Sequence, residues 1–203
     1  MKLFYSPASP YARKVLVLAH EKGIAGKLEL IDVKVNPVEV NEIVQRHNPL
    51  GKIPFLLLSD ARCLFDSNVI TAYLDGLGAP RLIPDGGPAR FDALTVEALA
   101  DGILDSCLLT RYETILRPSD KFWQPWHDGQ MAKIDRGLDF IEARWSGTLN
   151  GAITIGVIAV ACALGYLDFR FPDKDWRRNH PMLASFYCDF DARASMKQTQ
   201  PVG

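Results

Sequence analysis

The stretch KLFYSPASPY (residues 2–11) joins a strand pattern directly to a helix pattern, and the first part of the chain is organised around it. Residues 2–5 form a short apolar run bounded by Ser-Pro, which predicts a buried strand. Ser9 and Pro10 then predict the start of a helix, because serine is a favoured N-cap and proline a favoured first helical residue. The helical pattern continues until Gly23, a typical stop.

The segments that follow extend this pattern to a β-α-β unit. Residues 28–33 (LELIDV) alternate enough to predict a second strand, and residues 38–46 predict a short helix. The run NPLGKIPFLLL at residues 48–58 predicts a turn followed by a central strand from Phe55 to Leu58. Pro54 cannot donate a ladder hydrogen bond, so we expect it at the head of that strand, where a cis bond is also expected.

A hairpin partner and a third helix complete the first part of the chain. Residues 62–65 are expected to pair with the central strand, and Asp66-Ser67 to cap a helix that buries Val69, Ile70, Tyr73 and Leu74. The sequence therefore predicts an α/β fold for this part.

The densest cluster of chain breakers, four glycines and three prolines in residues 76–88, predicts a domain boundary. We expect one domain at residues 1–77, a linker at 78–87 and a second domain at 88–203. Strand patterns disappear beyond the linker, so the second domain is predicted to be an all-α bundle. Its expected helices cover residues 89–116, 121–145, 154–169 and 180–194.

Composition excludes several classes of partner. A formal net charge of -1 gives no electrostatic footprint for nucleic acid or for an anionic membrane surface. The amino terminus shows no signal-peptide pattern, and the apolar stretch Gly151–Leu167 carries Thr154 and glycines, so we expect a buried core helix rather than a membrane span. A cytoplasmic location is expected.

The four cysteines are widely separated and lack the pairing of a zinc or redox site. They are expected to be small buried hydrophobes in a reducing compartment, and no metal is expected. These residues are Cys63, Cys107, Cys162 and Cys188.

Together, the order of elements and the motifs resemble the glutathione S-transferase family over nearly the whole chain. The resemblance implies a thioredoxin-like glutathione-binding domain, an all-α electrophile-binding domain, glutathione as co-substrate, a homodimer and a role in detoxification. It is carried by Ser9-Pro10-Tyr11 with Arg13-Lys14, by residues 48–54, by Asp66-Ser67 with Ile70, Tyr73 and Leu74, and by ALADGI (98–103) and ALGYLDFRF (163–171), which resemble the helical domain of a bacterial branch.

Ser9 is the candidate catalytic residue. An unperturbed thiol has a pKa of about 8.5, so only a few per cent is ionised at pH 7. The Ser9 hydroxyl can donate to the sulfur while the positive helix end stabilises the anion, and no general base is required. Serine cannot form a mixed disulfide, which favours attack on an electrophile over reductase chemistry. Ser9 as a simple cap, or Ser6 or Tyr5 as the hydroxyl donor, are the alternatives.

Other residues suit the remaining parts of glutathione. The helix that Asp66-Ser67 opens can bind the γ-glutamyl carboxylate at its N-terminus, and Asp66 can bind the ammonium. The backbone of Ile53, next to Pro54, can bracket the cysteinyl unit as an added strand would. The glycyl carboxylate needs a cation, for which Lys52 is nearest in sequence, with His47 and Lys34 behind it. Tyr11 completes the expected glutathione site.

The electrophile is expected against the first long helix of the second domain. Candidates that mix aromatic and apolar surface with one cation are Tyr11, Leu108, Arg111, Tyr112 and Ile115. Their spacing is equally that of a helix face turned to the core. Asp101 is a further candidate, since in relatives an acidic residue near this point reaches the γ-glutamyl ammonium across a dimer.

The leading hypothesis is a glutathione transferase that activates the thiolate for attack on a hydrophobic electrophile. One alternative is a glutathione-binding regulatory or carrier module without turnover. A second is a glutathione-dependent isomerase or dehalogenase that uses the same thiolate.

Overall fold

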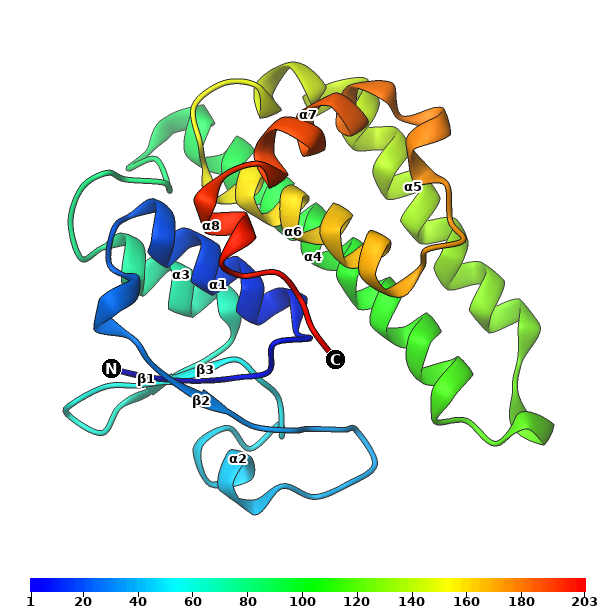
Figure 1. Cartoon of the computed structure of the whole chain (residues 1–203), viewed down its shortest axis with the longest axis horizontal. Helices are drawn as coiled ribbons and strands as arrows, with labels where there is room; N and C mark the ends of the chain where they lie inside the picture. Colours follow the sequence, from blue (N-terminus) through cyan, green and yellow to red (C-terminus); the bar gives the residue numbers. More distant parts are fainter. The chain divides into compact units, whose positions relative to one another are not determined.

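The computed structural model describes residues 1–203, and its contacts divide the chain into two units. The first unit contains Met1–Asp85 together with Arg193–Gly203, and the second contains Gly86–Ala192. Strands occur only in the first unit, and the second is built from long helices (Figure 1). The predicted second domain, residues 88–203, includes the last eleven residues, which the contacts group with the first unit. The predicted bounds of the glutathione-binding and electrophile-binding domains stay a prediction.

The first unit is built on a four-stranded mixed sheet with the order β2-β1-β3-β4. Strand β1 is parallel to β2, antiparallel to β3, and β3 is antiparallel to β4. This is the thioredoxin-like arrangement predicted from the sequence. The strands are β1 (Lys2–Tyr5), β2 (Glu29–Asp32), β3 (Phe55–Leu57) and β4 (Cys63–Leu64).

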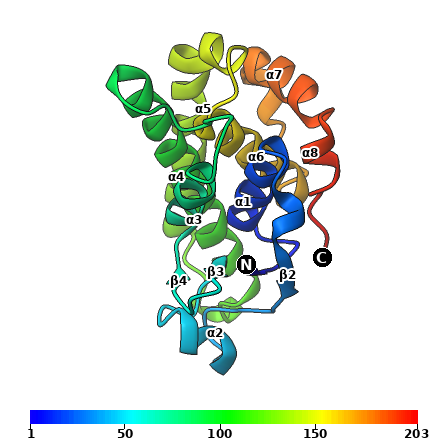
Figure 2. The same cartoon turned by 90° about the vertical axis from the view of Figure 1, so that its left-hand side faces the viewer.

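Helices cover both faces of this sheet. Helix α1 (Pro10–Glu21) packs against α3 (Ser67–Asp75) on one face, and α2 (Glu42–His47) lies on the other (Figures 1 and 2). On the α2 face, Val44 packs with Phe4 and Phe55, whose rings stack with centroids 4.4 Å apart. A short 3-10 turn, Ala25–Lys27, connects α1 to β2.

Helix α2 begins four residues later than the predicted start at residue 38. Asn41 is its N-cap, with a side-chain oxygen that accepts from the Val44 N–H at 3.1 Å. The preceding residues form a turn in which Asn36 pairs with Glu39. The apolar periodicity of residues 38–46 therefore spans a turn as well as a helix.

The second unit consists of α4 (Gly87–Ile115), α5 (Gln124–Leu149), α6 (Ile155–Arg170) and α7 (Pro181–Asp191), with short turns at Ser119–Lys121 and Trp176–Asn179. Every residue of α6 from Ile155 to Leu167 is buried, which confirms the predicted core helix. No helix of the structure is both long and apolar enough to cross a membrane.

The helix predicted at residues 180–194 is interrupted. Helix α7 ends at Asp191, and a separate short helix, α8 (Ala194–Lys197), begins after Arg193. Helix α8 belongs to the first unit, where it packs on α1. The Arg193 guanidinium donates twice to the Glu21 carboxylate at 2.8 Å, and a guanidinium nitrogen of Arg13 donates to the Met196 carbonyl at 3.2 Å.

Two glycines allow close packing of the helices in the second unit. A Cβ on Gly156 of α6 would lie 2.7 Å from the Ala93 carbonyl oxygen and 2.9 Å from the Val96 side chain in α4. A Cβ on Gly137 of α5 would lie 2.7 Å from Ile103. The α4–α6 crossing depends on the absence of a side chain at Gly156, because the atoms it would meet include backbone; at Gly137 the Ile103 side chain would have to move.

A buried ion pair joins the ends of α1 and α3. The Lys22 ammonium donates to Asp75 at 3.1 Å, and their side chains are only 1% and 0% exposed. Burial alone would favour the neutral acid, but the Leu82 N–H, Lys22 and the Ile83 N–H all donate to Asp75 and hold its pKa below the ordinary value. Arg81 adds a further contact at 2.9 Å.

Replacement of Asp75 by asparagine is expected to destabilise the protein by about 3–5 kcal/mol, because it leaves the buried Lys22 ammonium without its counter-charge. Urea unfolding followed by circular dichroism measures the change. The matched control is Asp60→Asn, which removes a carboxylate that is 51% exposed and pairs with Arg62 at 2.7 Å. Little change is expected there; equal midpoints for the two variants would contradict the assignment.

Candidate functional site

The topology gathers four loops at one edge of the sheet. The carboxyl ends of β1 and β2 lie together because Tyr5 pairs with Asp32 in a parallel register. Strand β3 is antiparallel to β1, so its first residue, Phe55, lies at the same edge, opposite Phe4. Strand β4 runs antiparallel to β3 and therefore also ends there, at Leu64. The loops that hold Ser9, Ile53-Pro54 and Asp66-Ser67 consequently share this edge.

Ser9 is the N-cap of α1, as predicted. Its backbone is extended, and its Oγ accepts from the Ala12 N–H at 3.2 Å. A hydroxyl has one hydrogen and two lone pairs, so this cap uses an acceptor position and leaves the O–H able to donate to a ligand. Ser6 instead closes the preceding turn, where its carbonyl accepts from the Ser9 N–H at 2.9 Å and its Oγ from the Ala8 N–H at 3.4 Å.

The loop before β3 contains the expected cis peptide bond, between Ile53 and Pro54. Ile53 precedes the first paired residue of β3, so its backbone lies outside the β1–β3 ladder. The buried Asn48 side chain spans this loop: its Nδ2 donates to the Lys52 carbonyl at 2.9 Å, and its Oδ1 accepts from the Leu50 N–H at 3.1 Å. The sequence analysis placed Asn48 in a turn and in the motif of residues 48–54, but did not predict that its side chain braces the loop.

Asp66 is the N-cap of α3, and Ser67 is its first helical residue. The Asp66 carboxylate accepts from the Asn68 N–H at 3.0 Å and is exposed, whereas Ser67 is 3% exposed. Asn68, which the sequence did not single out, accepts from the buried Lys14 ammonium at 2.5 Å. This bond ties the start of α3 to the first turns of α1, so both helix N-termini are held at the same edge.

A hollow of ≈ 490 Å³ lies next to the loop that carries Ser9. Lys34 brings a cation to this hollow, and Lys52 is exposed elsewhere on the β3 loop. His47, the half-buried last residue of α2, has its ring centroid 5.9 Å from that of Phe4 and 5.5 Å from that of Phe55. Of the three cations considered for the glycyl carboxylate, Lys34 is therefore the one that shares a hollow with this loop. The lining residues are Ser6, Lys34, Val35, Asn36, Glu39, Val40 and Asn41.

The electrophile candidates divide between the two units. Tyr11 is the second residue of α1 and half-buried, while the others lie on the C-terminal half of α4. Burial raises the pKa of Tyr112, and the nearby Arg111 opposes that effect. Asp101 is half-buried on the same helix. The α4 candidates are Leu108, Arg111 and Tyr112, which are half-buried, and Ile115, which is exposed.

Two residues of α6 next to these candidates were missed. Tyr166 and Arg170 lie within the ALGYLDFRF motif, which the sequence reading used only as a mark of resemblance. Burial raises the pKa of Tyr166 to about 12, against the opposing effects of Arg111 and Arg170. Both Tyr166 and Arg170 therefore belong to the electrostatic surroundings of Arg111.

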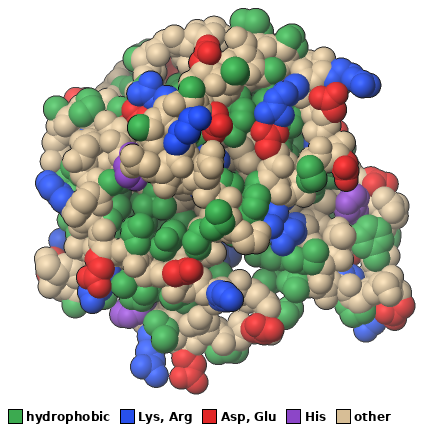
Figure 3. All heavy atoms as spheres, in the orientation of Figure 1, with side chains coloured by type: hydrophobic (Ala, Val, Ile, Leu, Met, Phe, Trp, Pro, Cys, Tyr) green, Lys and Arg blue, Asp and Glu red, His purple; other side chains and the backbone are tan.

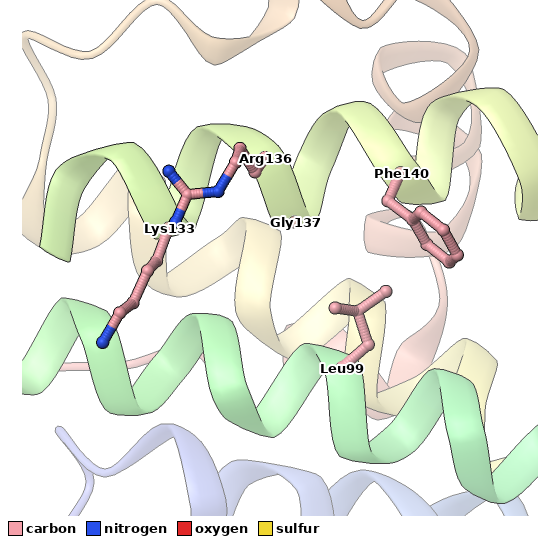
Figure 4. A pocket seen from close by; sticks show the side chains of 5 residues that line it. All are labelled: Leu99, Lys133, Arg136, Gly137 and Phe140. Carbon is pink, nitrogen blue, oxygen red and sulfur yellow. The ribbon is translucent and has the colours of Figure 1, made fainter. Parts of the chain in front are cut away.

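A second hollow, of ≈ 390 Å³, lies between α4 and α5 and contains none of the predicted site residues. Figure 4 shows Leu99 on α4 facing the Phe140 ring on α5, with the Lys133 side chain extending toward α4. Arg136 and Gly137 complete its lining. This hollow is therefore separate from the candidate site.

The surface charges are mixed in sign, whereas the burial of the cysteines differs in part from the prediction. On the face shown in Figure 3, acidic and basic side chains are interspersed over most of the surface. All four cysteines are free thiols, but only Cys107 and Cys162 are buried. The prediction of a buried side chain was wrong for Cys188, which is exposed on α7, and Cys63 in the short strand β4 is only half-buried. Burial raises the pKa of the Cys107 thiol to about 12, with Lys174 opposing it, so this thiol is held protonated. No three His, Cys, Asp or Glu side chains are grouped to hold a metal ion.

Family models match both parts of the chain. The glutathione S-transferase N-terminal domain matches residues 8–77, and the glutathione S-transferase C-terminal domain matches residues 124–187. A curated relative, the uncharacterized GST-like protein YibF of Escherichia coli K12, is 34% identical over 99% of this chain and 98% of its own length.

Solved structures of glutathione transferase family members match this chain over its full length. A glutathione transferase family member from Pseudomonas fluorescens Pf-5 with bound glutathione is 47% identical, covers 100% of this chain and 99% of its own, and has a TM-score of 0.98. A second structure of a family member from the same strain, with bound S-(propanoic acid)-glutathione, is also 47% identical with full coverage of both chains and a TM-score of 0.93. On these grounds, the chain belongs to the glutathione S-transferase family.

Proposed function

We propose that this protein is a glutathione transferase that uses Ser9 to stabilise the glutathione thiolate. The observation that carries the proposal is the position of the Ser9 hydroxyl, at the N-cap of α1 and on the sheet edge shared with Ile53-Pro54 and the start of α3. The glutathione bound in the structure of the 47% identical relative supports the same ligand here.

The chemistry needs only a modest preference for the anion. A pKa decrease of about two units corresponds to about 2.7 kcal/mol of preferential thiolate binding. A hydrogen bond from the Ser9 O–H to the charged sulfur contributes about 1.5–3 kcal/mol, and the positive end of the twelve-residue α1 adds to it. The serine hydroxyl stays neutral throughout, and the thiol proton leaves to solvent.

The other parts of glutathione are assigned to the surrounding loops. Asp66 binds the γ-glutamyl ammonium, and the N-terminus of α3 with the Ser67 hydroxyl binds the γ-glutamyl carboxylate. The Ile53 backbone beside Pro54 pairs with the cysteinyl unit. Lys52 or Lys34 neutralises the glycyl carboxylate, and Lys34 has the support of the neighbouring hollow. Tyr11, the second residue of α1 after the Ser9 cap and Pro10, is assigned to the same glutathione site.

The reaction that we propose is conjugation. The thiolate attacks an electrophilic carbon, a C–S bond forms, and the electron pair goes to a leaving group or to the end of an activated double bond. Leu108, Arg111 and Tyr112, together with Tyr11, contact the electrophile. The conjugate S-(propanoic acid)-glutathione, bound in a structure of a 47% identical relative, supports this reaction class. A cytoplasmic location, supported by the four free thiols, and a role in detoxification are proposed with it.

Ser9→Ala is expected to raise the pKa of bound glutathione by about one to two units, because a hydrogen bond to the charged sulfur is lost. Turnover of a model electrophile at pH 7 falls accordingly by about tenfold or more. Ultraviolet titration of the bound thiolate and steady-state kinetics measure the two effects.

Thr154→Ala is the matched control, since Thr154 caps α6 through the same kind of bond, to the Val157 N–H at 3.4 Å. It loses about 1 kcal/mol of cap stability, as Ser9→Ala does, without a change in thiol pKa. Full activity of Ser9→Ala would refute the role of Ser9, and Ser6→Ala then tests the neighbouring hydroxyl. Glutathione binding without turnover on a panel of electrophiles would favour the regulatory module instead.

Asn48→Ala is expected to raise the KM for glutathione about tenfold with little change in kcat, because the loop before β3 loses the side chain that holds Lys52 and Leu50. Steady-state kinetics at saturating electrophile separate the two constants. Asn179→Ala, an exposed residue of a turn in the second unit, is the control. An unchanged KM in a folded Asn48→Ala protein would exclude this bracing role.

We propose a homodimer, the assembly that the resemblance implies. Sedimentation equilibrium is expected to give twice the chain mass of 22.6 kDa at micromolar concentration. A mass equal to that of one chain over a hundredfold range of concentration would contradict the proposal.

A further inference from the structure

The packing of α4 against α6 places Arg111 beside Arg170. Close approach of Gly156, at the start of α6, to Val96, in the first half of α4, sets the register of the two helices. Each helix rises about 1.5 Å per residue in the same direction, so Arg170, fourteen positions after Gly156, lies beside about residue 110, fourteen positions after Val96. Tyr166 lies by the same reasoning beside about residue 106, one turn earlier. Figure 1 shows the two helices side by side.

Tyr166 and Arg170 are linked to each other and to an aromatic ring. They stand four residues apart on one face of α6 and share a hydrogen bond. The Arg170 guanidinium carbon lies 3.7 Å from the centre of the Phe169 ring, and this cation–π contact helps to orient the planar guanidinium group. Arg170 is half-buried, and Tyr166 is 5% exposed.

Arg111 and Arg170 place two positive charges close together, and each charge disfavours the other. Burial lowers the pKa of Arg170, and the charge of Arg111 lowers it further. Two guanidinium groups that repel each other in a partly desolvated site gain stability when an anion lies between them. Tyr166 stays protonated, so its hydroxyl remains a donor.

We propose that Arg111, Arg170 and Tyr166 form a carboxylate-binding subsite, so that the electrophiles conjugated by this protein carry a carboxylate. A carboxylate matches the planar fork of arginine and accepts two parallel hydrogen bonds from it. This inference rests on the proposed transferase function and changes its substrate class, from a purely hydrophobic electrophile to an anionic one with an apolar body.

A pair of aryl chlorides tests the preference. In 4-chloro-3-nitrobenzoate and 4-chloro-3-nitrobenzamide, the thiolate attacks the carbon that bears chlorine, the C–S bond forms, and chloride leaves with the electron pair of the broken C–Cl bond. The two compounds have nearly the same shape, but one carries an anionic carboxylate and the other a neutral amide. We measure kcat/KM for each and divide it by the rate constant of the uncatalysed reaction with glutathione.

The benzoate is expected to show about a tenfold larger enhancement than the benzamide, the effect of one charge-assisted contact. Arg111→Gln and Arg170→Gln each lower the benzoate enhancement about tenfold more than the benzamide enhancement, and so remove this preference. Tyr166→Phe reduces the preference while it keeps the buried ring. The control is Arg178→Gln, whose side chain is 80% exposed and lies outside the cluster, and which retains the preference.

Binding of the two products gives a readout that does not need turnover. We titrate S-(4-carboxy-2-nitrophenyl)glutathione and S-(4-carbamoyl-2-nitrophenyl)glutathione calorimetrically and expect about tenfold tighter binding of the carboxylate, lost in Arg111→Gln. Equal affinities, or equal losses for both conjugates in the arginine variants, would overturn the subsite. Selective binding of the carboxylate without turnover of either chloride would overturn the transferase function and leave the subsite standing.

Discussion

The first unit depends on the buried carboxylate of Asp75. It is the last residue of α3, yet its two oxygens bind the ammonium at the end of α1 and two backbone N–H groups of the segment that leaves the unit. Lys22 in turn donates to the Gly78 carbonyl at 2.6 Å and to the Pro80 carbonyl. Two helices and the connecting segment are thereby fixed at the ends remote from the site.

The opposite ends of the same helices carry the site. Because α1 and α3 are fixed at their C-termini by the Asp75 network and near their N-termini by the Lys14–Asn68 bond, Ser9 and Asp66 are held on rigid elements. A serine cap is compatible with a second task, since capping consumes a lone pair and thiolate binding consumes the hydrogen. The same local structure that starts the helix therefore supplies the donor of the proposed chemistry.

Structural features that depend only on residues adjacent in the chain were predicted from the sequence. The strand-to-helix change at KLFYSPASPY, the cap at Ser9 and the cis bond before Pro54 all follow from the residues on the spot. Contacts between distant residues were not predicted, such as Lys22 with Asp75, 53 positions apart, or Asn48 across its loop. The apolar periodicity of residues 180–194 also gave no sign that Arg193 would leave the helix to bind Glu21.

The same limit applies to the electrophile side of the site. Arg111 was found as the one cation among apolar neighbours on its helix, because spacing within a helix is visible in a sequence. Tyr166 and Arg170 stand on a different helix, and only the glycine-dependent contact of α6 with α4 sets them beside it.

The position of α8 in the sequence determines when the first unit can complete its contacts during synthesis. Residues 193–203 belong to the first unit but follow the whole second unit in the sequence. The helical unit is therefore an insertion in the thioredoxin-like one. During synthesis, Glu21 and Arg13 leave the ribosome long before Arg193 and Met196, their partners. The surface of α1 that α8 covers stays open until residues 193–197 have been synthesised, so maturation of the first unit is coupled to synthesis of the second.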